Sequence, residues 1–218
     1  MRSFQNLLLL QNLYRLKAVG YDYIDPIVIN HRDEQTLPSQ LGPLHSMISQ
    51  CHLCDLSKSR RQPMSGQGNP KADVMFIDAY VSLAEDESGE YYVGRSGGSL
   101  KKMIENVLEM PYEETYITHA VKCKPLGSNR PSASEWNSCK SYLFKQIELV
   151  APQIIVPLGP EAYRLVCNDE GNFDQVRGQK IEFGRATIIP IYHPTFLLRN
   201  PSLRQTTFND LQIIKSAL

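Results

Sequence analysis

The sequence of 218 residues lacks an excess of charge of either sign, since it holds 23 Lys and Arg against 23 Asp and Glu. A strongly basic chain would point to nucleic acid through its overall field, and this chain gives no such sign. Any anionic partner must therefore be held by a local patch of cations. The sequence also has no internal repeat and no low-complexity tract, and its hydrophobic content of 42% is that of an ordinary globular protein.

Long apolar runs are missing as well. The N-terminal run extends only from Leu7 to Leu10, before Gln11 and Asn12 interrupt it. This length is too short for a membrane span and poor as the apolar region of a signal peptide. We therefore expect a cytoplasmic protein with no membrane partner, and the neutral charge is compatible with a monomer.

The first part of the chain is expected to be an appendage. Residues 4–18 have apolar side chains weighted to one side of a helix, and Gly20 fits its C-terminal stop. The stretch that follows, to about residue 44, has no periodicity and is typical of a linker or arm. We divide the chain into an N-terminal helix and arm over 1–48, where the helix is a candidate docking element for a protein partner, and a domain over 49–218.

The domain alternates between apolar runs and helical patterns. Such compact runs, rich in Ile and Val, are typical of strands buried on both faces of a parallel sheet. The expected strands are residues 73–77, 115–121, 154–158 and 186–191, and the expected helices are 99–108, 133–150 and 160–166. This order predicts the α/β class, as a three-layer α/β/α sandwich around a four-stranded parallel sheet, with an N-terminal helical arm.

Polar and loop-forming residues gather where these runs end. They are residues 78–82, His119 with 122–125, Gly159, and His193 followed by Pro194. In open parallel sheets, ligands bind beyond the carboxyl ends of the strands. Two histidines and an aspartate are therefore expected to converge on one edge of the sheet and form a binding site.

Four of the five cysteines form a spaced set. Cys51 and Cys54 are a C-x2-C pair, and Cys123 and Cys139 follow sixteen positions apart. In a cytosolic protein, such thiols are more often metal ligands than disulfides. The wide second spacing is not that of a zinc ribbon, which supplies C-x2-C twice. Spacing alone leaves open an iron–sulfur cluster, a zinc ion or no metal, and Cys167 is expected to be a core residue.

Seven motifs in order give this chain a resemblance to the iron–sulfur uracil-DNA glycosylases of bacteria and archaea. No single motif is specific, but the four cysteine positions together with H-P-x-x-L-L-R are. The resemblance covers about residues 49–214. The motifs are C-H-L-C-D-L at 51–56, E-D-x-x-G-E-Y-Y-V-G-R-S-G at 85–97, I-T-H-A-V-K-C-K-P at 117–125, N-R-P at 129–131, C-K-S-Y-L at 139–143, I-I-V-P-L-G at 154–159 and Y-H-P-T-F-L-L-R at 192–199.

The resemblance implies both a cofactor and a reaction. Cys51, Cys54, Cys123 and Cys139 would hold a [4Fe-4S] cluster whose role in the family is mainly structural. The family hydrolyses the N-glycosidic bond of uracil in DNA after flipping the nucleotide out of the stack, a step of base-excision repair.

The resemblance also implies roles for residues of the site. Tyr92 stands where the family has a stacking phenylalanine, and it keeps the π-face while adding a hydroxyl. His193 matches the family histidine near the uracil O2, where it would donate a hydrogen bond to the developing charge. Residues 195–199 would form a loop pressed into the DNA minor groove, and 94–98 would offer backbone N–H groups to a phosphate. The expected DNA contacts are Arg95, Ser96, Asn129, Arg130, Thr195, Phe196, Leu197 and Arg199.

Two positions depart from the family pattern. The family's Gly-Glu-Ala-Pro-Gly turn is replaced by residues 78–82, so that its glutamate falls on Ala79. Asp78 is the nearest substitute carboxylate for orienting water, and Ser82 is expected near the substrate. The asparagine that reads the uracil edge is His119 here. An imidazole has its donor and acceptor on separate nitrogens, so it cannot make the amide's two contacts, and the loss in discrimination is on the order of 2 to 4 kcal/mol.

These observations favour a uracil-DNA glycosylase-like repair protein with weak or altered activity on uracil or another damaged base. Its catalytic residues would be His193 and Asp78, with Tyr92, His119 and Ser82 around the base. The alternative is a DNA-binding iron–sulfur module that has kept the fold and lost the chemistry. A third interpretation is a cluster-bearing interaction protein that docks through the N-terminal helix.

Overall fold

The computed structural model describes residues 14, 17, 37–127 and 130–218. The expected helix over residues 4–18 lies outside the described residues apart from two isolated positions, and Asn129 lies outside them entirely. Contacts divide the chain after Thr36, and the architecture below is that of Leu37–Leu218.

One mixed sheet forms the centre of this unit. Within the described residues it has six strands in the order β1-β3-β2-β4-β6-β5. The four inner strands are parallel and correspond to the four expected runs, whereas the two edge strands are antiparallel. The bounds are β1 (Gln67–Gly68), β2 (Val74–Tyr80), β3 (Tyr116–Val121), β4 (Ile154–Pro157), β5 (Ile181–Phe183) and β6 (Ala186–Ile188).

The α/β class and its helices on both faces are confirmed, but the expected count of four strands is wrong. The two missed strands are only two and three residues long. A run of that length on an exposed edge carries no detectable apolar pattern, because few of its side chains are buried.

Helices cover the sheet and connect its parallel strands. The described α-helices are α2 (Leu41–Ser49), α3 (Leu83–Ser88), α4 (Gly94–Met103), α5 (Ala133–Val150), α6 (Gly159–Cys167), α7 (Phe173–Val176), α8 (Pro194–Arg199) and α9 (Arg204–Lys215). A π-helical turn, Ile104–Leu108, extends α4, and 3-10 turns occur at Asp55–Lys58, Tyr112–Glu114 and Pro201–Leu203. The bounds of α5 agree with the sequence pattern, whereas α2 begins inside the expected linker. Among the described helices, none combines the length and apolarity needed to cross a bilayer.

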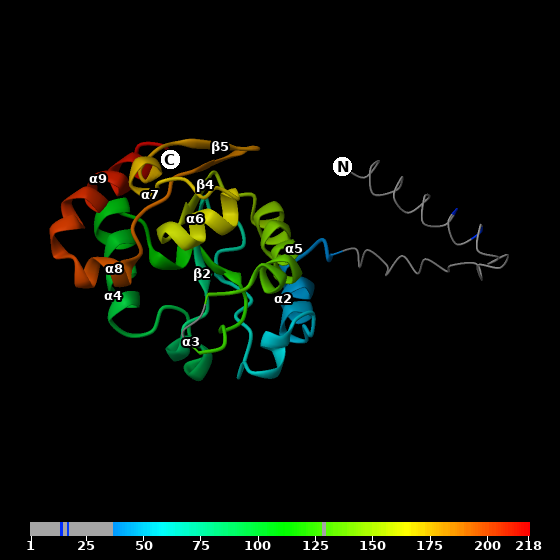
Figure 1. Cartoon of the computed structure of the whole chain (residues 1–218). Helices are drawn as coiled ribbons and strands as arrows, with labels where there is room; N and C mark the ends of the chain where they lie inside the picture. The colour runs from blue at the N-terminus through cyan, green and yellow to red at the C-terminus, as the bar shows by residue number, and fades with distance from the viewer. Residues whose placement is uncertain (1–13, 15–16, 18–36, 128–129) are drawn as a thin grey trace. The chain divides into compact units, whose positions relative to one another are not determined.

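The alternation of side chains along β2 builds two cores. Val74 and Phe76 pack with residues of α4 and α9, while Met75 and Ile77 pack with residues of α5 and α6. All four β2 side chains are fully buried, and each contributes about 1.5–3 kcal/mol relative to an exposed position. Figure 1 shows the corresponding layers, with α4, α8 and α9 on one side of the sheet and α5 on the other.

Helix α2 attaches the start of the unit to this second layer. Leu44 and Ile48, four residues apart on one face, pack against Cys139 and Tyr142 of α5. Because α2 ends at Ser49, this contact delivers Cys51 to the neighbourhood of Cys139.

Candidate functional site

Asp78 lies inside β2, two residues before the strand ends, and is paired in register with His119 of β3. Its Oδ1 accepts the backbone N–H of Ala79 at 2.7 Å, and its Oδ2 accepts the Tyr92 hydroxyl at 2.9 Å. The same Oδ2 lies 3.0 Å from Nε2 of His193. The carboxylate is thus fixed from three sides, and its side chain is only 14% exposed.

His193 is the N-cap of α8, where its Nδ1 accepts the backbone N–H of Thr195 at 3.1 Å. Since Nδ1 is an acceptor there, the neutral ring carries its proton on Nε2 and donates it to Asp78. Gly159 makes room for this histidine. It has a positive φ of 85°, and a Cβ at this position would lie 3.1 Å from the Cβ of His193.

The two partners shift each other's protonation. Burial alone raises the pKa of Asp78, but the charge and hydrogen bond of His193 outweigh it and lower the value to about 2. Burial lowers the pKa of His193, and the Asp78 carboxylate, aided by Glu85, raises it above the usual value. Asp78 is therefore an anion at neutral pH, and it stabilises positive charge beside it.

Tyr92 is held in a conformation that bulky residues avoid. Its φ is +51°, and left-handed backbone at such a residue costs on the order of 1–3 kcal/mol. Its backbone N–H donates to Oε1 of Glu85 at 2.9 Å, and its hydroxyl is held by Asp78. The first turn of α4 packs directly on it, because a Cβ on Gly97 would lie 1.4 Å from the Tyr92 carbonyl oxygen. The position of the Tyr92 ring is thus fixed by Asp78 of β2, by Glu85 in the cap of α3 and by the first turn of α4.

Glu85 is a central residue that the sequence analysis did not assign to the site. It belongs to the capping box of α3, where its Oε2 accepts the backbone N–H and the hydroxyl of Ser82 at 2.9 and 2.8 Å. The S-x-x-E pattern at 82–85 is the signal that predicts such a cap. The Ser82 hydroxyl, expected near the substrate, is therefore engaged in starting a helix.

His119 lies deeper than a base-reading residue needs to be. Its side chain is fully buried, and its Nε2 lies 3.2 Å from Oε2 of Glu85 without the alignment of a hydrogen bond. Among the described residues neither ring nitrogen has a hydrogen-bond partner. The centroid of the His119 ring lies 5.3 Å from that of Tyr91 and 6.5 Å from that of Tyr92. In this structure the His119 side chain is therefore not accessible to a base.

The expected minor-groove loop is a short helix, α8. Phe196 is 43% exposed and Leu198 38%, whereas Leu197 is only 2% exposed. In this structure Leu197 therefore packs inward, and Leu198, which the sequence analysis did not single out, points outward with Phe196. Thr195 is tied to His193, and Arg199 is exposed at the end of the helix.

The other expected DNA contacts lie in α4 and in the segment before α5. Arg95 and Ser96 are in the first turn of α4, whose N-cap, Val93, provides no side-chain hydrogen bond. The N–H groups of that turn are therefore not capped by the residue that precedes it. Arg130 is 72% exposed and lies 3.1 Å from Oε2 of Glu161.

The four spaced cysteines meet around one cavity, although they come from different elements. Cys51 follows α2, Cys54 precedes the 3-10 turn, Cys123 follows β3, and Cys139 is on α5. Cys167, at the end of α6, does not line this cavity.

Cations and donors surround the same cavity. Arg60 donates to Sγ of Cys123 at 3.0 Å and to the carbonyl oxygen of Cys51 at 2.6 Å. The backbone N–H of Lys122 lies 3.4 Å from Sγ of Cys139. In the described part of the chain, no group of three or more His, Cys, Asp or Glu side chains is close enough to hold a metal ion as it stands. The four thiols nevertheless line one shared cavity, and two donors lie beside their sulfur atoms.

The sequence is similar to several known proteins. The sequence is 33% identical over 183 residues to the Type-4 uracil-DNA glycosylase of Sulfurisphaera tokodaii, covering 80% of this chain and 83% of the relative. It is 32% identical over 179 residues to that of Saccharolobus solfataricus, covering 78% of this chain and 83% of the relative. It is 33% identical over 175 residues to that of Archaeoglobus fulgidus, covering 77% and 87%. The sequence model of the Uracil DNA glycosylase superfamily matches residues 65–212, and the chain belongs to this superfamily.

Proposed function

We propose that this protein is a DNA N-glycosylase of base-excision repair that hydrolyses the N-glycosidic bond of a flipped uracil. One observation carries the catalytic assignment: the Asp78 carboxylate and the Nε2–H of His193 lie 3.0 Å apart at the carboxyl edge of the parallel strands. Membership of the superfamily supports the reaction class, and the position at the strand ends supports the site.

The pair can serve both ends of the breaking bond. As the bond from C1′ of the sugar to the base breaks, its electron pair goes to the base, and negative charge develops on the base oxygen. The Nε2–H of His193 turns from Asp78 to that oxygen and stabilises the charge. The released Oδ2 of Asp78 then accepts a hydrogen bond from the water whose oxygen bonds to C1′.

The low pKa of Asp78 defines its part in this step. A carboxylate with a pKa of about 2 is a weak base, so it orients the water and stabilises the cationic sugar by its charge. The proton of the water passes to solvent, and the departing base takes a proton from solvent. The Tyr92 hydroxyl keeps its hydrogen bond to Asp78 throughout, which holds the carboxylate in place.

Base selection is where this site differs from the family pattern. Tyr92 supplies the aromatic face, but His119, at the asparagine position, is buried against Glu85. The unpaired ring nitrogens of His119 provide one donor and one acceptor once the pocket opens. They point in different directions, so we expect weaker selection for uracil than an amide gives.

We further propose that Cys51, Cys54, Cys123 and Cys139 hold a [4Fe-4S] cluster. This assignment is supported by the shared cavity and by the Arg60 guanidinium beside Cys123. Burial raises the pKa of Cys123, and Arg60 opposes this shift by stabilising the thiolate that binds iron. When bound, the cluster would cross-link α2, the end of β3 and α5, with no part in the reaction at Asp78.

A DNA-binding protein without glycosylase activity is the second candidate. The observations that favour it are Ala79 at the glutamate position and the fully engaged oxygens of Asp78. For both candidate functions we propose that DNA is the partner and that the protein is a cytoplasmic monomer.

A single-turnover excision assay tests the proposal. Excess protein is mixed with uracil-containing single- and double-stranded oligonucleotides, and hot alkali then cleaves at abasic sites. We expect cleavage by the wild type and a loss of about 100-fold or more in rate for Asp78→Asn and for His193→Ala.

The matched control is Asp73→Asn. Asp73 immediately precedes β2, at the end of the strand away from Asp78, and its Oδ1 accepts a hydrogen bond from Nε2 of Gln153 at 2.8 Å. This variant is expected to cleave like the wild type. Intact uracil in the presence of bound wild-type protein would exclude the enzyme and favour the DNA-binding module.

A further inference from the structure

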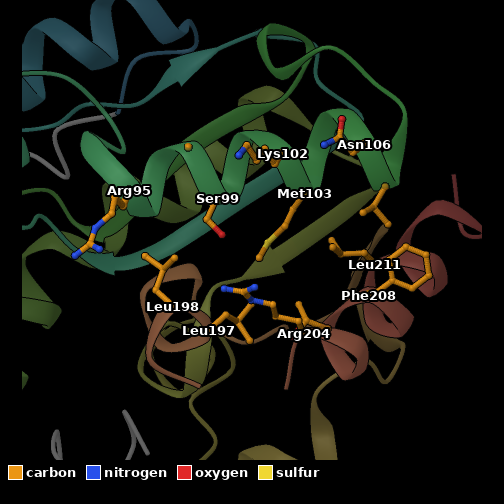
Figure 2. Close-up of a pocket in the computed structure, with 13 residues that line it drawn as sticks. Arg95, Ser99, Lys102, Met103, Asn106, Leu197, Leu198, Arg204, Phe208 and Leu211 are labelled. Atoms are coloured by element: carbon orange, nitrogen blue, oxygen red, sulfur yellow. The ribbon is translucent and has the colours of Figure 1, made fainter. Parts of the chain in front are cut away.

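A groove of about 580 Å³ lies between α4 on one side and α8 and α9 on the other. Figure 2 shows Arg95, Ser99 and Lys102 along α4, Asn106 on the π-helical turn that extends it, and Leu198, Arg204 and Phe208 across from them. None of these residues belongs to the Asp78 network, and the reaction proposed above does not use the groove.

Polar side chains of α4 and of the π-helical turn after it form one stripe along the groove. Arg95, Ser99 and Lys102 are spaced by four and three residues, the separations that place side chains on one face of an α-helix, and Asn106 of the π-helical turn lines the same groove. At 1.5 Å per residue, the stripe is about 16 Å long, which equals roughly five nucleotides at the 3.4 Å spacing of a B-form strand. It begins in the first turn of α4, so the groove continues from the proposed phosphate contacts.

The charge of the groove is of one sign. Arg95, Lys102 and Arg204 line it, and among the residues that the structure describes no acidic side chain does. Within the described residues none of these three cations is part of an ion pair, whereas the neighbouring Lys101 lies 3.5 Å from Glu105 and 3.9 Å from Glu113. In a chain with no net charge, three such cations around one hollow are a local attraction for an anion.

The remainder of the lining is apolar and includes an exposed aromatic ring. Phe208 is 43% exposed, and Met103, Leu198 and Leu211 are its apolar companions in the groove. A cationic groove with an aromatic platform is the combination that binds single-stranded nucleic acid, because phosphates pair with the cations and a base stacks on the ring.

We infer that this groove binds a single-stranded stretch of the DNA that flanks the excised nucleotide. The inference rests on the proposed function in taking DNA as the substrate. Backbone phosphates contact Arg95, Lys102 and Arg204, and one base packs on Phe208. A hollow between helices accommodates one strand with its bases, and we therefore expect a paired duplex to gain little from it.

Binding to uracil-free DNA tests this inference without any excision. Fluorescence anisotropy is followed for a labelled single strand of 12 nucleotides and for its duplex, between 50 and 200 mM salt. We expect Lys102→Gln and Arg204→Gln each to raise the Kd for the single strand about threefold to tenfold, and to reduce the slope of log K against log salt by about 0.7.

Phe208→Ala is expected to raise the same Kd about fivefold without changing that slope, because stacking involves no counterion release. The control is Lys101→Gln, which removes the same charge from the adjacent position of α4 and is expected to change the Kd less than twofold.

Equal effects of Lys102→Gln and Lys101→Gln would overturn the inference and leave the groove to another occupant, such as a protein. Equal losses on duplex and single strand would also overturn it, because the cations would then belong to a general DNA surface. If the wild-type protein excises no uracil but shows the expected binding pattern, the proposed function is contradicted and the groove assignment stands.

Discussion

At the scale of single residues, the carboxylate of this site lies on one defined side of β2. The Ala79 side chain packs with residues of α5 and α6, whereas Asp78 reaches Tyr92 and His193 on the other side. Neighbouring residues of a strand point to opposite faces, so a shift by one position reverses the direction of approach. A carboxylate at position 78 therefore faces the histidine, and one at position 79 would face α5 and α6 instead.

The contact between Asp78 and His193 predicts how Asp78→Asn changes the titration of His193. Burial lowers the pKa of His193, and the Asp78 anion is the main group that raises it. Removing the anion leaves burial in place, as well as the Thr195 N–H that needs an unprotonated Nδ1. We therefore expect the pKa of His193 to fall below the wild-type value, so that the neutral ring persists to lower pH. An NMR titration of the imidazole carbon-bound protons measures the shift. An unchanged pKa would show that the 3.0 Å contact does not persist in solution.

At the scale of elements, the contact between α4 and Tyr92 gives a prediction on two adjacent glycines. A Cβ on Gly97 meets the Tyr92 carbonyl oxygen at 1.4 Å, whereas a Cβ on Gly98 meets no atom within 4 Å. We expect Gly97→Ala to lower the free energy of unfolding by about 1–3 kcal/mol and to reduce excision, because Tyr92 must move. Gly98→Ala is expected to raise the free energy of unfolding by up to about 1 kcal/mol, since alanine favours a helix interior. Urea denaturation measures both, and equal effects would contradict the close packing.

The elements also show what the sequence can and cannot predict. The inner strands were predictable because burial on both faces leaves a continuous apolar run, and α5 was predictable from its length and its S-x-x-E cap. The edge strands β1 and β5 were not, because their register is set by neighbours rather than by their own side chains. Helix α8 was expected as a loop, although Pro194 at its first position is typical of a helix start.

The candidate site, too, was predictable only in part from the sequence. The positions of Asp78 and His193 at the sheet edge were predictable from strand order, and their mutual contact needed the fold. Glu85 was missed because its cap pattern predicts a helix start, and only the structure brings its carboxylate to His119 and Tyr92.

At the scale of the whole molecule, the formal net charge is zero, so only local patches of cations can attract the DNA that we propose as the partner. The exposed Phe196 and Leu198 of α8, the first turn of α4 and the cationic groove are neighbouring parts of one side, as Figure 1 shows for α4, α8 and α9. The cysteine cavity involves α2, β3 and α5 instead. The proposed chemistry and the proposed cofactor are thus built on different helical layers of one sheet.

That separation predicts that the cluster contributes stability rather than catalytic groups. We expect anaerobic protein to contain about four iron and four sulfide per chain, and Cys139→Ser to lose both. Because the cluster would cross-link three elements, its loss is expected to remove about 3 kcal/mol or more, which lowers the Tm by about 6–12 °C. Cys167→Ser is the control, since Cys167 lies outside the cavity and its replacement leaves all four ligands. Metal and sulfide analysis with thermal unfolding of both variants measures these effects. Stoichiometric zinc in the wild type, or equal metal loss in the two variants, would contradict the assignment, since of the two replaced cysteines only Cys139 lines the cavity.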